Sequence, residues 1–170
     1  MKRVPAILGS ALFLVIAPGG VAGLLPWWIS GWRMQPPLLH FFPFRVIGVL
    51  LIAAGIPVLL DSFVRFAVQG VGTPAPILPT QHLVVTGFYR YVRNPMYVAA
   101  GGMIIGQGLL LGDVRVLGYG AVAWLASHLF VIGYEEPTLR RSFGDEYRNF
   151  CANVCRWIPQ LSPWRGKATQ

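Results

Sequence analysis

Charge is scarce in this sequence. Only 12% of its 170 residues are Asp, Glu, Lys or Arg, about half the fraction found in a typical soluble domain. Hydrophobic residues make up 55% of the chain, the mean hydropathy is +0.57, and the apolar residues come in long blocks rather than at amphipathic spacing. These features exclude an ordinary soluble domain and indicate an integral membrane protein.

Cysteine and acidic residues are also few. Cys151 and Cys155 have a C-x3-C spacing that matches neither a zinc site nor a secreted disulfide framework, so we expect two free thiols and no metal site. Six acidic residues against 14 Lys and Arg give a net charge of +8. The basic residues flank apolar blocks and nothing resembles a helix-turn-helix or a zinc finger, so the charge indicates contact with anionic lipid headgroups rather than with nucleic acid.

The apolar blocks predict an all-α integral membrane protein with about four transmembrane helices, forming one domain over residues 1–170. A hydrocarbon core of ~30 Å needs about 20 helical residues, and each block is close to that length. The spans are expected at about residues 4–28, 44–68, 95–111 and 116–134. A cleavable signal peptide is the alternative for the first block. The apolar character continues through Trp27 and Trp28, which favours a retained span.

Local signals set the limits of the last two spans. Asn94 is a favoured N-cap residue and Pro95 suits the first helical position, so the third span is expected to begin there. Residues 112–115 form a predicted tight turn, which makes spans three and four an antiparallel hairpin.

Residues 138–150 predict an amphipathic helix at the membrane interface, although Gly144 weakens it. Lys and Arg gather in the first residues, in the loop before the third span and in the tail. The positive-inside bias then places both termini in the cytoplasm. The polar cytoplasmic part of the chain is expected at residues 72–97 and 135–160.

Three features inside the apolar blocks have both a structural and a functional interpretation. Asp61 and Arg65 lie four residues apart and predict an ion pair on one helix face, whereas Asp61 facing a site is the alternative. His128 is expected to be hydrogen-bonded to a neighbour rather than to act as a ligand. Gly102 and Gly106 allow close approach either of another helix or of a ligand.

Two polar clusters interrupt the apolar pattern, and the hairpin is expected to bring them to the same membrane face. The first is TGFYRYVRNPMY, residues 86–97, and the second is the pair Glu135 and Glu136. We expect the pair to lie at a helix C-terminus, where carboxylates are disfavoured unless Arg90, Arg93 or a bound ligand neutralises them.

The start of the third span favours an anion, because the first N–H groups of a helix have no partner within it. Tyr89, Tyr91 and Tyr97 supply aromatic faces that attract organic cations. A zwitterionic ligand therefore fits between the two clusters. The alternative is an interfacial belt of Tyr and Arg with a salt bridge.

These residues carry a resemblance to a known superfamily. TGFYRYVRNPMY, followed by YEEPTLRRSFGDEYRNF and CRWIP, resembles the isoprenylcysteine carboxyl methyltransferase and phospholipid methyltransferase superfamily. The resemblance covers roughly residues 72–159, including the GTPAP loop. It implies a small integral-membrane enzyme that binds S-adenosylmethionine from the cytoplasmic side and methylates a lipophilic acceptor. Asn94 stands where carboxyl methyltransferases usually have His, and Phe150 stands where many members have a second Tyr.

The resemblance also implies which residues form the site. The implied cofactor-binding residues are Tyr89, Arg90, Tyr91, Arg93, Asn94, Pro95, Tyr97, Glu135 and Glu136. The candidates for catalysis are Arg93, Glu135 and Glu136. An arginine, Arg93 rather than Arg156, would direct a carboxylate acceptor, whereas a glutamate would take the proton from an amine acceptor.

The acceptor itself stays open at this point. A prenylated cysteine, a phospholipid amine, a small thiol and a quinone-like or terpenoid lipid all fit the pattern. The lipid tail would enter laterally between spans, at an entrance shaped by Asp61, Gly102 and the GTPAP loop. The alternative functions are a non-catalytic membrane scaffold or carrier and a NADPH-dependent lipid reductase of related fold. The sequence leaves the oligomeric state open.

Overall fold

The computed structural model describes residues 16–66, 68 and 82–166. These residues form helices and connecting segments and no strand, which confirms the all-α prediction for this part of the chain. The elements after residue 19 are η1 (Gly20–Leu24), α2 (Leu25–Ser30), η2 (Leu38–His40), α3 (Pro43–Arg65), η4 (Gly87–Arg90), α4 (Pro95–Leu111), α5 (Val114–Phe130), η5 (Val131–Glu135) and α6 (Glu136–Asn153). The short elements η1 and η5 are π-helical turns, and η2 and η4 are 3₁₀ turns.

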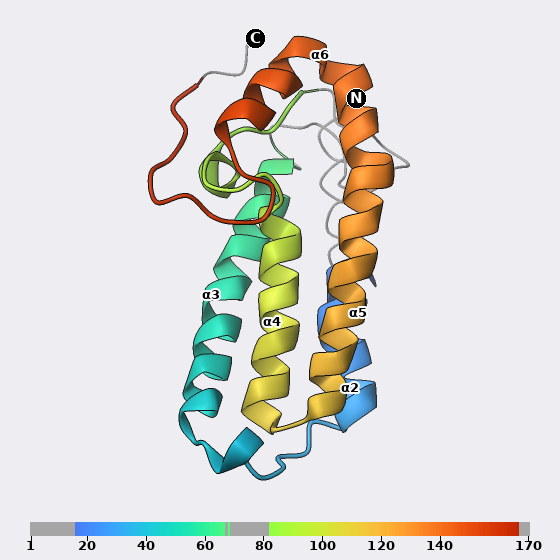
Figure 1. Cartoon of the computed structure of the whole chain (residues 1–170), viewed down its shortest axis with the longest axis vertical. Coiled ribbons are helices and arrows are strands. Elements are labelled where there is room, and N and C mark those ends of the chain that lie inside the picture. Colours follow the sequence, from blue (N-terminus) through green and yellow to red (C-terminus); the bar gives the residue numbers. More distant parts are fainter. Residues whose placement is uncertain (1–15, 67, 69–81, 167–170) are drawn as a thin grey trace.

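The apolar helices α3, α4 and α5 lie side by side along the long axis of the molecule, with α2 next to one end of α5 (Figure 1). Glycine allows α3 and α4 to approach closely. A Cβ atom on Gly106 would lie 2.7 Å from the carbonyl oxygen of Gly48, so both helices need glycine at this crossing. Gly102, one turn earlier, faces open space instead.

Each predicted span falls on a helix wherever the structure describes it, but the helix of the fourth span continues beyond the predicted end at residue 134. α3 and the continuous helix Val114–Asn153 are long and apolar enough to cross a membrane, and α4 is a shorter apolar helix with the predicted limits. The predicted residues 4–15, 67 and 72–81, with the GTPAP loop, lie outside the described residues. A helix count of four spans and the side on which the termini lie stay predictions.

The prediction of a helix C-terminus at Glu135 is wrong. α5 passes through η5 into α6 without leaving helical backbone angles, and Figure 1 shows one unbroken rod extending beyond the ends of α3 and α4. Pro137 lacks the N–H that an α-helix needs. The π-helical turn just before it has a wider hydrogen-bond spacing, and this spacing accommodates the proline without ending the helix.

Helix α6 changes direction at Gly144, whose φ of 50° and ψ of −121° lie outside the helical region. After Gly144, α6 turns back over the polar end of the bundle (Figure 1). Tyr147 and Phe150 are buried there against Val84 and Val85. The amphipathic pattern is thus confirmed, but its apolar side packs on the protein itself.

Residues 154–166, named here the C-terminal strap, run back along the start of α4. The backbone N–H of Gln160 donates to the carbonyl of Tyr91, and that of Trp164 donates to the carbonyl of Arg90, both at 2.9 Å. The strap therefore closes the polar end of the bundle from outside.

The opposite end of the hairpin is a tight turn, as predicted. Gly112 has a φ of +72°, which favours glycine, and the buried carboxylate of Asp113 accepts a hydrogen bond from the backbone N–H of Arg115. Gln35 donates its side-chain amide to the same carboxylate at 3.1 Å. This turn fixes α4 and α5 as antiparallel neighbours.

We expect Gly106→Ala to destabilise the fold, because its new methyl group meets the backbone of α3. Overpacking of this kind costs about 1–3 kcal/mol. Gly118→Ala is the matched control, since a Cβ there meets nothing within 4 Å. Thermal unfolding in detergent should show a lower midpoint for the first variant alone, and equal midpoints would contradict the crossing at Gly48.

Candidate functional site

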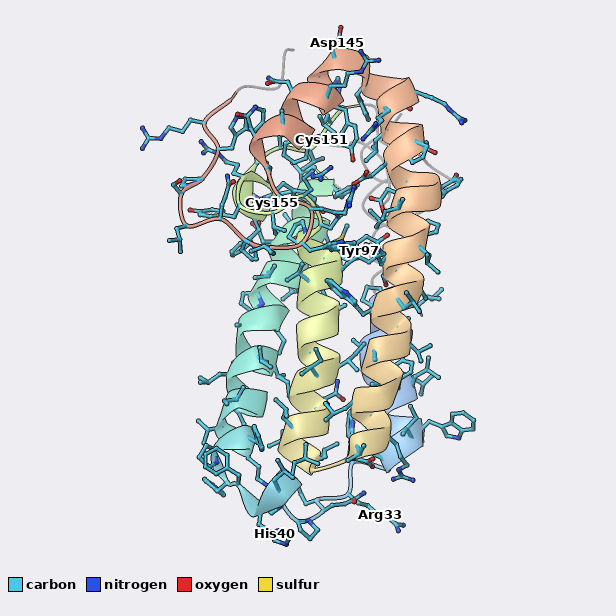
Figure 2. All side chains as sticks on the ribbon, in the orientation of Figure 1. Arg33, His40, Tyr97, Asp145, Cys151 and Cys155 are labelled. Atoms are coloured by element: carbon cyan, nitrogen blue, oxygen red, sulfur yellow. The ribbon has the colours of Figure 1, made fainter. Side chains whose placement is uncertain are left out.

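The two polar clusters meet at one end of the bundle, where α3 ends, α4 begins and η5 passes into α6. Arg93 contacts Glu136 and Tyr97 contacts Glu135 across this end. Figure 2 shows Tyr97, Cys151 and Cys155 here, and Arg33 and His40 at the far end of the molecule.

Glu136 is buried, with 5% of its surface exposed, and arginines surround it. Arg156 binds it as a fork, through Nε at 2.6 Å and Nη2 at 3.0 Å. Arg93 Nη1 lies 3.1 Å from Oε1, and the more exposed Arg140 lies 4.0 Å from Oε2. Burial alone would raise the pKa of Glu136, but the hydrogen bond from Arg156 and the charges of Arg93 and Arg156 outweigh it and lower the pKa below the usual range. Glu136 is therefore held as a carboxylate.

Arg93 links the start of α4 to the end of α6. Its Nη1 also donates to the thiol sulfur of Cys151 at 2.9 Å, and its backbone N–H donates to the carbonyl of Cys155 at 2.9 Å. Its Nε is buried and has no hydrogen-bond partner among the described residues. Arg93 therefore keeps one unused donor inside the site.

Glu135 faces a different neighbourhood from Glu136, because successive helical residues point about 100° apart. Its Oε2 accepts a hydrogen bond from the Tyr97 hydroxyl at 2.9 Å. Burial raises the pKa of the Glu135 carboxyl, and the negative charge of Glu136 raises it further. The hydrogen bond from Tyr97 opposes this shift without cancelling it. A half-buried carboxyl with a raised pKa and one neutral partner is suited to accept a proton.

Beside Glu135 lies an apolar cavity of about 190 Å³. It lies between the first described helix, α3, α4 and α5. Its lining residues are Ala17, Pro18, Val21, Leu59, Phe63, Phe66, Met96, Tyr97, Ala100, Gly101, Ile104, Ala123, Trp124, Ser127, Phe130 and Glu135. Glu135 is the one ionisable acid or base among them apart from the phenol of Tyr97, so the cavity offers an apolar interior with a carboxyl at its polar end.

Trp157 from the strap packs against two aromatic rings that line this cavity, those of Trp124 and Tyr97. Its ring centroid lies 4.7 Å from that of Trp124 and 6.4 Å from that of Tyr97, edge-on to the latter. Its Nε1 donates to Nδ1 of His128 at 3.0 Å. His128 is thus hydrogen-bonded to a neighbour, as predicted.

The remaining predicted site residues lie around this centre rather than in it. Tyr89 is buried in the core against Phe66, with 5% of its surface exposed. Arg90 donates from Nε to the carbonyl of Trp164, so it holds the strap and not the glutamates. Tyr91 lies on the outer side of the bundle, where it lines two other hollows.

Asn94 occupies the N-cap position of α4, but the prediction that it caps the helix with its side chain is wrong. Its amide instead donates to the carbonyl of Arg156 at 3.2 Å, which ties the strap to α4. Pro95 fills the first helical position as predicted. Asp61 and Arg65 form the predicted ion pair, at 2.7 Å, on another side of the bundle.

The strap contributes more contacts to the site than its sequence predicts. Arg156 binds Glu136, and Trp157 packs against Tyr97, the partner of Glu135. Arg156 was expected only as the less favoured arginine for a carboxylate acceptor. The signal that could have identified Arg156 was the R-x-I-P pattern within CRWIP. Among the described residues no three His, Cys, Asp or Glu side chains gather in a way that could hold a metal ion.

Comparison with known proteins places this geometry in context. The profile of the phospholipid methyltransferase family matches residues 44–146, more than half of the chain. The chain is 36% identical over 67 residues to a phosphatidylethanolamine N-methyltransferase from Laccaria bicolor, and 30% identical over 87 residues to the nickel-cobalt-cadmium resistance protein NccN from Alcaligenes xylosoxydans xylosoxydans. These matches cover 39% and 51% of this chain, but only 7% and 40% of the two relatives.

We expect Arg156→Lys to destabilise the protein, because a lysine cannot reproduce the fork on Glu136. Losing one hydrogen bond to a charged, buried group costs about 1.5–3 kcal/mol. Arg140→Lys is the matched control, since Arg140 is exposed and lies 4.0 Å from the same carboxylate. Unfolding midpoints in detergent compare the two variants, and an equal loss in both would show that the fork is unimportant.

Proposed function

Because the chain belongs to the phospholipid methyltransferase family, we propose that it is an S-adenosylmethionine-dependent methyltransferase acting on a lipophilic acceptor at the membrane face. The observation that carries the proposal is the placement of Glu135. This half-buried carboxyl lies at the polar end of an apolar cavity, and Arg93, which binds the adjacent Glu136, has an Nε with no partner among the described residues.

The described residues suit two charged groups of S-adenosylmethionine, its carboxylate and its sulfonium. Arg93, whose Nε has no partner among the described residues, suits the carboxylate. The rings of Tyr97, Trp124 and Trp157 suit a sulfonium by cation–π attraction. When bound, this cofactor supplies an electrophilic methyl group.

The other proposed cofactor-binding residues support this arrangement from around it. Glu136 holds Arg93 and Arg156 in place, and Asn94 holds the strap. Pro95 sets the start of α4, Tyr89 fills the core beneath it, and Arg90 and Tyr91 bind the strap through their carbonyls. Glu136, Asn94 and Tyr89 thus act through their side chains, whereas Pro95, Arg90 and Tyr91 act through the backbone.

The charges at the cavity support an amine acceptor over a carboxylate acceptor. Among the described residues no arginine lines the cavity, and Arg93 and Arg156 both bind Glu136 instead. Glu135 is placed to receive the proton that an amine nitrogen loses when it gains a methyl group. The apolar lining suits the tail of a lipid and excludes water from the carboxyl.

Binding and activity of Glu135→Gln test the proposal. The substitution keeps the shape and a hydrogen-bond acceptor for Tyr97 but removes the base. We expect transfer of radiolabelled methyl groups into phosphatidylethanolamine to fall by about 10²–10⁴-fold. Asp145→Asn is the control, because the Asp145 carboxylate is exposed and paired with Arg148.

Calorimetry on the detergent-purified protein separates the alternatives. We expect S-adenosylhomocysteine and S-adenosylmethionine to bind the wild type. Binding of neither compound would indicate a non-catalytic scaffold or carrier, and binding of NADPH alone would indicate a lipid reductase.

We also propose four spans with both termini and the site on the cytoplasmic side, in agreement with the distribution of Lys and Arg. Cys155 is a natural reporter, since it is exposed at the site end while Cys151 is half-buried. A membrane-impermeant maleimide should label inside-out vesicles and spare intact cells. Cys155→Ser should abolish the labelling, and labelling of intact cells would reverse the orientation.

A further inference from the structure

A second hollow lies on another side of α3 and α4 from the cavity beside Glu135. It is an apolar groove of about 380 Å³ along the outside of the two helices. Gly101 faces the first cavity, whereas its neighbour Gly102 lines the groove. The two spaces are thus separated by the body of α4.

Small residues open the groove. Ala54, Gly55, Ala99 and Gly102 line it. A Cβ on Gly102 would meet nothing within 4 Å, whereas a Cβ on Gly55 would lie 2.5 Å from Cγ of Met103. The groove follows α3 from Leu51 to Val58 and α4 from Pro95 to Gly102, which is about 10 Å at ~1.5 Å per residue. This length is about two thirds of one leaflet of a ~30 Å hydrocarbon core. The groove therefore has the position and the polarity of a site for an acyl chain.

A polar basin adjoins the groove at the end of α3. Asp61, Arg65 and Arg90 line it, together with Thr86, Gly87 and Pro163. Asp61 pairs with Arg65, so their charges cancel. The charge of Arg90 then makes the lining of the basin positive overall. Arg90 uses Nε for the strap, and no described residue bonds its two terminal nitrogens. The basin therefore suits an anion.

The guanidinium of Arg65 is held against the backbone of Gly87. Gly87 has a φ of +57°, and a Cβ there would lie 1.9 Å from Nε of Arg65, so a larger residue would displace the arginine. The guanidinium also donates to Thr86 at 3.0 Å. The floor of the basin is thus built by close packing rather than by flexible surface side chains.

Phe88 and Tyr91 line both spaces and join them. The combined surface has an apolar groove at membrane depth and a cationic basin at the end of the same apolar helix. We propose that it binds a phospholipid, with one acyl chain in the groove and the phosphate at Arg90. This site is separate from the proposed acceptor cavity, because it lies on a different side of α4 from Glu135.

The strap forms part of this lipid site. Pro159 lines the groove and Pro163 lines the basin, while Arg156 and Trp157 of the same segment reach Glu136 and Tyr97. A bound phospholipid therefore holds the strap in its closed position and stabilises the polar end of the bundle.

Thermal unfolding with defined lipids tests the proposal on the full-length protein in detergent micelles. Dioleoyl phosphatidylglycerol should raise the unfolding midpoint of the wild type, whereas dioleoylglycerol, which lacks the phosphate, should raise it much less. Gly102→Leu fills the groove and should remove most of the shift. Gly118→Leu is the control and should keep it, because Gly118 lies in open space on α5.

Arg90→Gln should weaken phosphatidylglycerol binding by about 10- to 100-fold, the equivalent of a charged hydrogen bond. If phosphatidylglycerol raises the unfolding midpoints of the wild type and Gly102→Leu equally, the groove does not bind the acyl chain. This outcome does not depend on whether Arg90→Gln folds. Equal shifts with the two lipids would overturn the phosphate contact. If inorganic phosphate alone raises the midpoint as much as phosphatidylglycerol does, the ligand of the basin is a free anion and the phospholipid proposal is wrong.

Discussion

A single buried carboxylate, Glu136, connects the separate segments of the polar end. Arg93 reaches it from the start of α4, Arg156 from the C-terminal strap and Arg140 from its own helix. Removing one partner of a buried ion pair typically costs about 3–5 kcal/mol, because a charge is left without compensation in a medium that solvates it poorly. This charge is one of several contacts that hold the strap, together with the backbone hydrogen bonds to Arg90 and Tyr91, and it fixes Arg156 next to Trp157, whose ring meets that of Tyr97 edge-on.

The π-helical turn η5 gives the adjacent glutamates two separate tasks. Since the helix continues through them, their side chains point in different directions around one axis. Glu136 points to the arginines and stays ionised, whereas Glu135 points to Tyr97 and the apolar cavity. Pairs of like residues that their surroundings drive to different protonation behaviour are a general feature of enzyme sites.

The sequence predicted local features better than distant contacts. The Asn94–Pro95 step, the turn at Gly112 and the Asp61–Arg65 pair each depend on residues within four positions, and each was found. The predicted helix end at Glu135 failed because a proline after a π-helical turn is tolerated, and no local rule separates this case from a true end. Asn94 lies at the N-cap position but makes no capping hydrogen bond, because its side chain is turned to donate to the carbonyl of Arg156, 62 residues away. The roles of the proposed site residues stay predictions.

The strap also orders the steps by which the protein matures. Chains emerge from the ribosome from the N-terminal end, so Glu136 is synthesised 20 residues before Arg156, its closest partner. During that interval the carboxylate has only Arg93 and Arg140 to neutralise it, and the aromatic cover of Tyr97 does not yet exist. The helical bundle can therefore be complete before the polar end is assembled. Proteolytic removal of residues 154–166 would take away the Arg156 fork on Glu136 and the Trp157 contact with Tyr97 while leaving the apolar helices in place.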